Sequence, residues 1–242
     1  MNKFIFRWIL VGVALILVVA GLLISRSEHT KTVCQDAIVI FNVDSSRQFI
    51  SQDAILEYML QNKFRYQGVP VNQMNLILAE EILLRQPFIE SVDCYMDLRG
   101  VLVINLEQRK PILRVYPKYG PPYYLDVEGR AFPLSLLFSS DVIVASGNIT
   151  PDMNNKLYTM AATVHQSSFW EHFIEHIFVE DNGDLVFTTQ ISGHQVVLGD
   201  TERLKGKLGK LESFYKQALM NMGWDQFREI NLEYKDQVIC RK

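Results

Sequence analysis

The chain has 242 residues, of which 24 are Lys or Arg and 27 are Asp or Glu, giving a formal net charge of -3. Nucleic-acid-binding proteins concentrate basic residues to replace phosphate counterions, so this balance argues against such a partner. Three cysteines are too few for a disulfide scaffold. The sequence has no phosphate-binding loop, nucleophile elbow or C-x-x-C pair, which argues against the enzyme classes that use these motifs.

The uncharged run from Trp8 to Ile24 is the first element along the chain. As a helix it spans roughly 25 Å, close to the ~30 Å of a hydrocarbon core, whereas the apolar region of a cleaved signal peptide is only about 7 to 15 residues long. The flanking charges slightly favour a cytosolic N-terminus. We therefore expect a cytosolic tail at residues 1–7, a transmembrane anchor at 8–24 and a juxtamembrane connector at 25–36.

Residues 37–111 have the pattern of a small α+β domain. Period-2 alternation and β-branched runs predict strands, and apolar residues at helical spacing predict helices. Ser51 is a cap for the first helix, and Pro87 ends the second. The predicted elements are strands at 37–43, 89–96 and 101–106 and helices at 51–62 and 75–86. Their order is βααββ.

Residues 112–242 predict a β-rich domain of short strands and two helices. The turn Asp181-Asn182-Gly183 is a strong hairpin signal. The predicted strands are 124–129, 141–145, 177–180, 184–189, 194–198 and 229–240, and the predicted helices are 154–165 and 201–222.

The last helix and the last strand of this domain have distinct patterns. The helix has one apolar stripe and a charged side that we interpret as a solvated face; the stripe is Leu204, Leu208, Leu211 and Phe214, and the charges are Arg203, Lys205, Lys207 and Lys210. In the strand, period-2 alternation directs Ile230, Leu232 and Tyr234 to the core and Asn231, Glu233 and Lys235 outward.

A competing signal is the H-x-x-E-H spacing of His172, Glu175 and His176, which is typical of one class of zinc metallopeptidases. On a helix, both histidines could share a zinc ion, with Glu175 as general base. However, residues 174–178 alternate as a strand does, which puts Glu175 opposite the histidines. We therefore interpret these histidines as ordinary surface or half-buried residues, and we expect no metal site.

Two readings stay open for Cys34 and Cys94. They could form a disulfide, or each could be an unpaired buried thiol, as expected for Cys94 on an apolar strand face.

Several short motifs follow one another along the chain: Pro87-Phe88-Ile89-Glu90-Ser91-Val92, Arg109-Lys110-Pro111, Leu125-Asp126-Val127-Glu128-Gly129-Arg130, Val197-Leu198-Gly199 and Ile230-Asn231-Leu232-Glu233-Tyr234. With these motifs and the βααββ order, the stretch from Cys34 to Pro111 resembles a polypeptide-transport-associated (POTRA) domain, and the chain as a whole is similar to bacterial division proteins of the FtsQ/DivIB family. Gln108 stands where the family usually has Glu, and Asn231 and Glu233 replace the usual Asp and Arg of the closing strand.

The resemblance implies an inner-membrane protein of the division septum that binds the small coiled-coil proteins FtsL and FtsB outside the cytosol and helps regulate septal peptidoglycan synthesis. It also implies no enzyme activity, and we accordingly expect no cofactor and no small-molecule substrate. The expected fold is α+β: one transmembrane helix, a POTRA-like domain (37–111), then a β domain (112–242) with a long amphipathic helix and a C-terminal edge strand. An extended partner segment can complete such an edge as an added strand. The expected partner-binding residues are Ile230, Asn231, Leu232, Glu233, Tyr234, Lys235 and Val238. The alternatives are the zinc peptidase and a POTRA-type protein-transport component.

Overall fold

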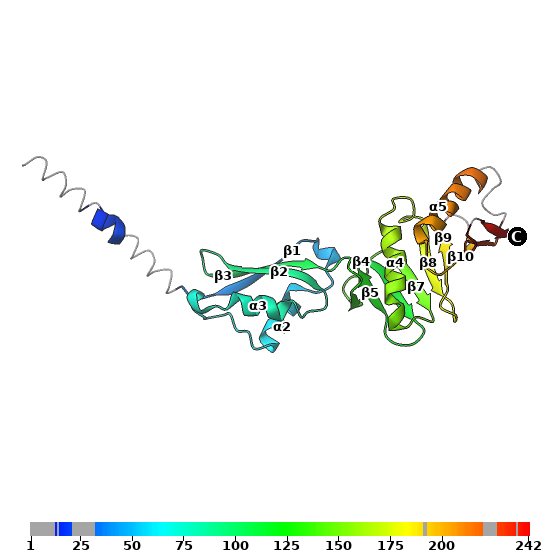
Figure 1. Ribbon diagram of the computed structural model, residues 1–242. Coiled ribbons are helices and arrows are strands. Elements are labelled where there is room, and N and C mark those ends of the chain that lie inside the picture. The colour runs from blue at the N-terminus through cyan, green and yellow to red at the C-terminus, as the bar shows by residue number, and fades with distance from the viewer. Residues whose placement is uncertain (1–12, 14, 21–31, 191–192, 220–226, 236) are drawn as a thin grey trace, which may run out of the picture. The chain divides into compact units, whose positions relative to one another are not determined.

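The computed structural model describes residues 13, 15–20, 32–190, 193–219, 227–235 and 237–242. The chain forms two compact units, which meet in the sequence between Gln108 and Arg109 (Figure 1). The boundary expected from the sequence lies at residues 111 and 112. Each unit has its own hydrophobic core.

The predicted membrane anchor falls largely outside the described residues. Of residues 8–24, positions 13 and 15–20 are described, and they are helical. Within the described part of the chain, no helix has the length and apolar character needed to cross a membrane.

The first unit has the predicted order βααββ. Its elements are β1 (Asp36–Phe41), α2 (Gln52–Gln61), α3 (Leu76–Leu83), β2 (Ile89–Met96) and β3 (Val101–Gln108). The helices begin where side chains satisfy free amides: the Ser51 hydroxyl accepts from the Ala54 amide, and Asn75 Oδ1 accepts from the Leu78 amide. The sheet order is β1-β3-β2, with β1 parallel and β2 antiparallel to β3.

Both helices of this unit pack on one face of the three-stranded sheet (Figure 1). The alternation predicted for the hairpin is confirmed, because Cys94, Leu102, Ile104 and Leu106 are buried against the helices. Gln108 is also buried, and its side chain accepts from the Phe49 amide at 2.7 Å and donates to the Arg47 carbonyl at 3.4 Å. A neutral amide suits this position, since it both accepts and donates.

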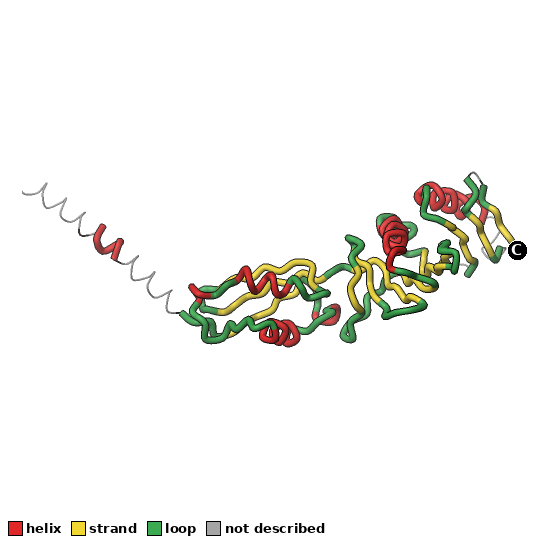
Figure 2. Tube along the Cα trace, turned by 60° about the horizontal axis from the view of Figure 1, so that its bottom comes forward, coloured by secondary structure: helices red, strands yellow, loops and turns green. Residues whose placement is uncertain are grey.

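The second unit is built on a nine-stranded mixed sheet (Figure 2). Its strands are β4 (Pro111–Pro117), β5 (Tyr123–Asp126), β6 (Ala131–Pro133), β7 (Ile143–Gly147), β8 (Ile174–Val179), β9 (Leu185–Thr189), β10 (Gln195–Gly199), β11 (Glu229–Asn231) and β12 (Ile239–Arg241). They lie in the order β12-β11-β10-β9-β8-β7-β4-β5-β6. The helices are α4 (Asn154–His165) and α5 (Leu204–Phe214), and a π-helical turn (Tyr215–Leu219) continues α5.

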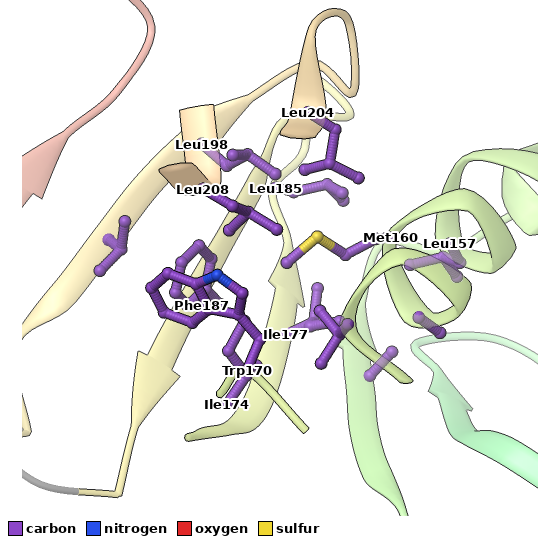
Figure 3. Close-up of a cluster of buried hydrophobic side chains, with 14 of the residues drawn as sticks. Leu157, Met160, Trp170, Ile174, Ile177, Leu185, Phe187, Leu198, Leu204 and Leu208 are labelled. Carbon is purple, nitrogen blue, oxygen red and sulfur yellow. The ribbon is translucent and has the colours of Figure 1, made fainter. Parts of the chain in front are cut away.

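Helices α4 and α5 bury their apolar sides in one core against the sheet. Figure 3 shows Met160 of α4 pointing toward Leu185 of β9 and Leu208 of α5. The predicted stripe of α5 is confirmed for three of its members, since Leu204, Leu208 and Leu211 are buried and Phe214 is half-buried. Beyond residue 219, the predicted helix lies outside the described residues.

The turn after β5 is organised by the buried carboxylate of Asp126. Its Oδ2 accepts from Arg109 at 2.8 Å and from Arg130 at 3.0 Å, and its Oδ1 accepts from the amides of Glu128 and Arg130. Burial by itself raises the pKa of Asp126, but these donors outweigh burial and lower it. The charge pairs fix the β5–β6 turn that the sequence predicted at Gly129.

Several elements of this unit differ from the sequence prediction. Strands β4 and β6 were not predicted, and β8 begins at Ile174 rather than at residue 177. A register shift between Ile174 and His176 breaks the predicted alternation of β8. Ile174 and Ile177 are both buried as a result, while Phe178 is 45% exposed.

Candidate partner-binding edge

The C-terminal residues form a short hairpin at one end of the nine-stranded sheet. β11 runs parallel to β10, pairing Val196 with Ile230, and β12 runs antiparallel to β11, pairing Ile230 with Cys240. Arg241 also pairs with Glu229 through an ion pair of 3.0 Å. β12 is the terminal strand in the sheet order, so within the described residues its outer side has no strand neighbour.

The prediction of one continuous strand over residues 229–240 is wrong. The chain leaves β11 at Leu232, whose amide donates to the Val197 carbonyl at 2.9 Å. The Asn231 side chain then accepts from the Glu233 amide at 2.9 Å, a local turn that competes with extended structure. The second strand of the hairpin begins only at Ile239.

This turn changes the position of two predicted binding residues. Ile230 and Leu232 are fully buried, as the alternation predicted, but Tyr234 is 54% exposed and not in the core. Lys235 and Glu233 are exposed as predicted, whereas Asn231 is half-buried. The predicted set therefore divides into buried residues that support the hairpin and exposed residues on its turn, with half-buried Asn231 holding the turn itself. Val238, just before β12, packs against the core.

Lys210 of α5 holds the hairpin turn from outside. Its Nζ donates to the carbonyl oxygens of Tyr234 at 2.6 Å, Lys235 at 3.0 Å and Gln237 at 3.4 Å. An ammonium group has three donors, so three convergent carbonyls satisfy all of them. This bridge links α5 to the loop that precedes β12.

Lys207, also on α5, contradicts the prediction of a solvated face. Its side chain is 5% exposed, and its Nζ donates to the Leu198 carbonyl, the Asp200 carbonyl and Asp200 Oδ1 at 2.9, 2.9 and 2.7 Å. These carbonyls lie in and just after β10, where the strand turns into α5. Lys207 is buried because its ammonium group replaces water as their donor.

The residues with H-x-x-E-H spacing, His172, Glu175 and His176, do not assemble into a metal site. His172 lies in a turn, not on a helix with His176. His172 and Glu175 line a cleft with His165 and Glu171, whereas the His176 ring interacts with Ser146 Oγ at 2.9 Å. Among the described residues, no group of three His, Cys, Asp or Glu side chains could hold a metal ion.

The cysteines are unpaired. Cys34 and Cys94 are buried free thiols, and Cys240 is a partly buried free thiol packed against the core of the second unit. Burial, together with the nearby carboxylates of Glu80 and Asp93, raises the pKa of Cys94 to about 12. Of the two interpretations of Cys34 and Cys94, the structure supports unpaired buried thiols and not a disulfide.

Two family comparisons divide the chain where the structure does. The model described as "POTRA-like domain" matches residues 32–107, and the model described as "FtsQ/DivIB, C-terminal related" matches residues 110–241. The chain belongs to the FtsQ/DivIB family. Proteins of this family are generally non-catalytic scaffolds of cell division and are generally membrane-associated. No curated protein matches the sequence.

The sequence prediction for this FtsQ/DivIB chain treated residues 229–240 as one edge strand. In the structure this stretch is divided, with β11 as an inner strand and β12 as the outer one. The sequence contains a signal for this division, because the polar pair Lys235-Asp236 separates two apolar segments and is typical of a turn.

Proposed function

We propose that this chain is a non-catalytic, membrane-anchored scaffold at the division septum, with its N-terminus in the cytosol and both units outside. It binds FtsL- and FtsB-type single-span proteins by strand addition at the C-terminal hairpin and thereby helps regulate septal peptidoglycan synthesis. The observation that carries the proposal is that β12 ends the sheet, with no strand paired to its outer side among the residues that the structure describes. An edge strand presents N–H and C=O groups that an extended segment can pair.

The two ends of the sheet are chemically different, which favours β12 as the binding edge. The opposite end is β6, Ala131–Pro133, where proline removes one backbone donor. β12 is Ile239–Arg241 and contains no proline. Proline therefore removes a donor from β6, whereas every residue of β12 keeps its backbone N–H.

The predicted binding residues have separate roles in this proposal. The side chains of Ile230 and Leu232 are buried and hold β11 in the sheet, and β12 pairs with β11. Tyr234 and Lys235 are exposed on the turn beside the edge, where they can contact a partner strand that extends past β12. Because each strand of the hairpin has only three residues, the Lys210 bridge contributes to holding the edge in place.

Photo-crosslinking in cells tests the proposal directly. A photoreactive residue is placed in the full chain at Ile239, Arg241 or Tyr234, and a matched control is placed at Ala131, on the other edge strand of the same sheet. We expect small single-span division proteins to be captured from the first three positions. Ala131 should give no such product.

Two results would contradict the proposal. Equal capture from Ala131 would mean that partner binding does not distinguish β12 from the other edge strand. Absence of any crosslinked single-span protein from Ile239, Arg241 and Tyr234 would rule out strand addition at β12.

A further inference from the structure

The three-stranded sheet of the first unit has a second face, opposite α2 and α3. The side chains directed to this face come from alternate positions of β1, β3 and β2. Register puts Ile38, Val103 and Tyr95 in one row across the three strands, with Ile40 in the next row. Val103 is 7% exposed between its neighbours, while Ile38, Tyr95 and Ile40 are 44%, 42% and 48% exposed.

Strand β1 is apolar on both of its faces. Between Asp36 and Asn42 it reads Ala-Ile-Val-Ile-Phe, and a continuous apolar run is typical of a strand that is covered on both sides, whereas a strand with one solvated face alternates with polar residues. Ala37 and Val39 are buried by the helices. Within the described residues, nothing packs over Ile38 and Ile40, so one side of this strand has the composition of an interface.

Charge on this face has a single sign. The outward positions of the three strands include the carboxylates of Asp36, Asp93 and Glu107, all exposed, and no Lys or Arg. Asp93 and Glu107 also line a shallow groove of about 350 Å³ together with Ile40. The face therefore combines an apolar centre with an acidic rim.

We propose that this face docks an amphipathic helix of a partner protein, with an apolar stripe flanked by Lys or Arg. Three strands span about 10 Å, the width of one helix, and eight residues of strand span about 26 Å, which matches a helix of about 18 residues. Docking would complete a helix–sheet–helix arrangement. The acidic rim disfavours a lipid surface, because the headgroups of anionic membranes repel carboxylates.

Two synthetic helical peptides of about 18 residues test the proposal on the full chain in nanodiscs of zwitterionic lipid. Both have the same Leu stripe, and their flanks are Lys in one peptide and Glu in the other. We expect the Lys peptide to bind about tenfold more tightly, and the difference to shrink as salt is raised. Neutralising the rim with Asp93→Asn and Glu107→Gln should remove most of that difference.

The apolar centre is tested by Ile38→Ser combined with Ile40→Ser, which should weaken both peptides about tenfold. The matched control is Leu60→Ser, because Leu60 is 52% exposed on α2, away from this face. Equal binding of the two peptides, or an equal effect of Leu60→Ser, would overturn the proposal.

In cells, a photoreactive residue at Ile40 should capture a protein at a basic amphipathic segment, and capture of lipid alone, or of nothing, would also overturn it. None of these readouts depends on β12.

Discussion

Replacing Lys207 with Met is the sharpest test of how α5 is attached to the sheet. Methionine keeps an unbranched apolar side chain in the buried position but removes the ammonium group that donates to the Leu198 carbonyl and to Asp200. We expect the second unit to lose stability without losing its fold. The carbonyl oxygens of Leu198 and Asp200 then each lose the hydrogen bond from Lys207.

The magnitude follows from the contacts. Loss of one partner of a buried ion pair costs about 3–5 kcal/mol, but Asp200 is 58% exposed and can be rehydrated, so about 2–3 kcal/mol is expected. The second unit comprises residues 109–242, and at about 2.1 cal/mol/K per residue its unfolding entropy is roughly 0.28 kcal/mol/K. The midpoint of thermal unfolding should therefore fall by about 7–11 °C.

Tryptophan fluorescence isolates this unit. Trp170 and Trp224 both belong to it, and residues 32–108 contain no tryptophan, so a Trp8→Phe background reports on the second unit alone. The control is Lys205→Met, since Lys205 is exposed on the same helix and its loss should change stability by less than about 0.5 kcal/mol.

Acid provides a second readout of the same contact. The hydrogen bond from Lys207 lowers the pKa of Asp200, so the stability it contributes is present above the ordinary aspartate pKa of about 3.9 and is lost as pH falls through the lowered value. The difference between the Lys207→Met variant and the unaltered chain should narrow below about pH 4. Equal unfolding midpoints for Lys205→Met and Lys207→Met at pH 7 would refute the reasoning.

Three further predictions concern buried titratable groups. Burial lowers the pKa of His194, so the unfolded state binds more protons than the folded state below about pH 6.5. Urea titrations should therefore show the free energy of unfolding of the second unit falling from pH 7 to pH 5, and His194→Phe should make that fall smaller. Asp126→Asn should cost about 2–4 kcal/mol at pH 7 and progressively less as acid protonates Asp126 in the unaltered chain, as measured by urea midpoints at pH 7 and 3. Alkylation followed by peptide mass analysis should label Cys240 before Cys94, and a Cys94 that stays unlabelled after unfolding without reductant would contradict the free thiol.

The first unit could be predicted from sequence because its local and tertiary signals agree. Ser51 and Asn75 cap the helices in the structure as their residue types suggest, and the hairpin of β2 and β3 has the alternation of a sheet with one face packed on helices. In the second unit the local signals conflict. β4 begins and ends with proline, which is typical of loops, yet its middle residues pair with both β5 and β7. Tertiary pairing therefore overrides the local pattern there.

The C-terminal hairpin shows why an edge cannot be predicted from periodicity. Alternation at Ile230 and Leu232 correctly predicts which face of β11 is buried, because that depends on side chains within the strand. Whether a strand is internal or terminal depends on its neighbours in the sheet. β11 pairs with β10 on one side, and it becomes internal only because the chain turns back after Leu232 and adds β12 on the other side. The family's closing motif, Ile230 to Tyr234, thus forms the strand that supports the edge and the start of the turn. A partner that pairs with β12 depends on this motif for the position of the edge, even where it does not contact Ile230 or Leu232.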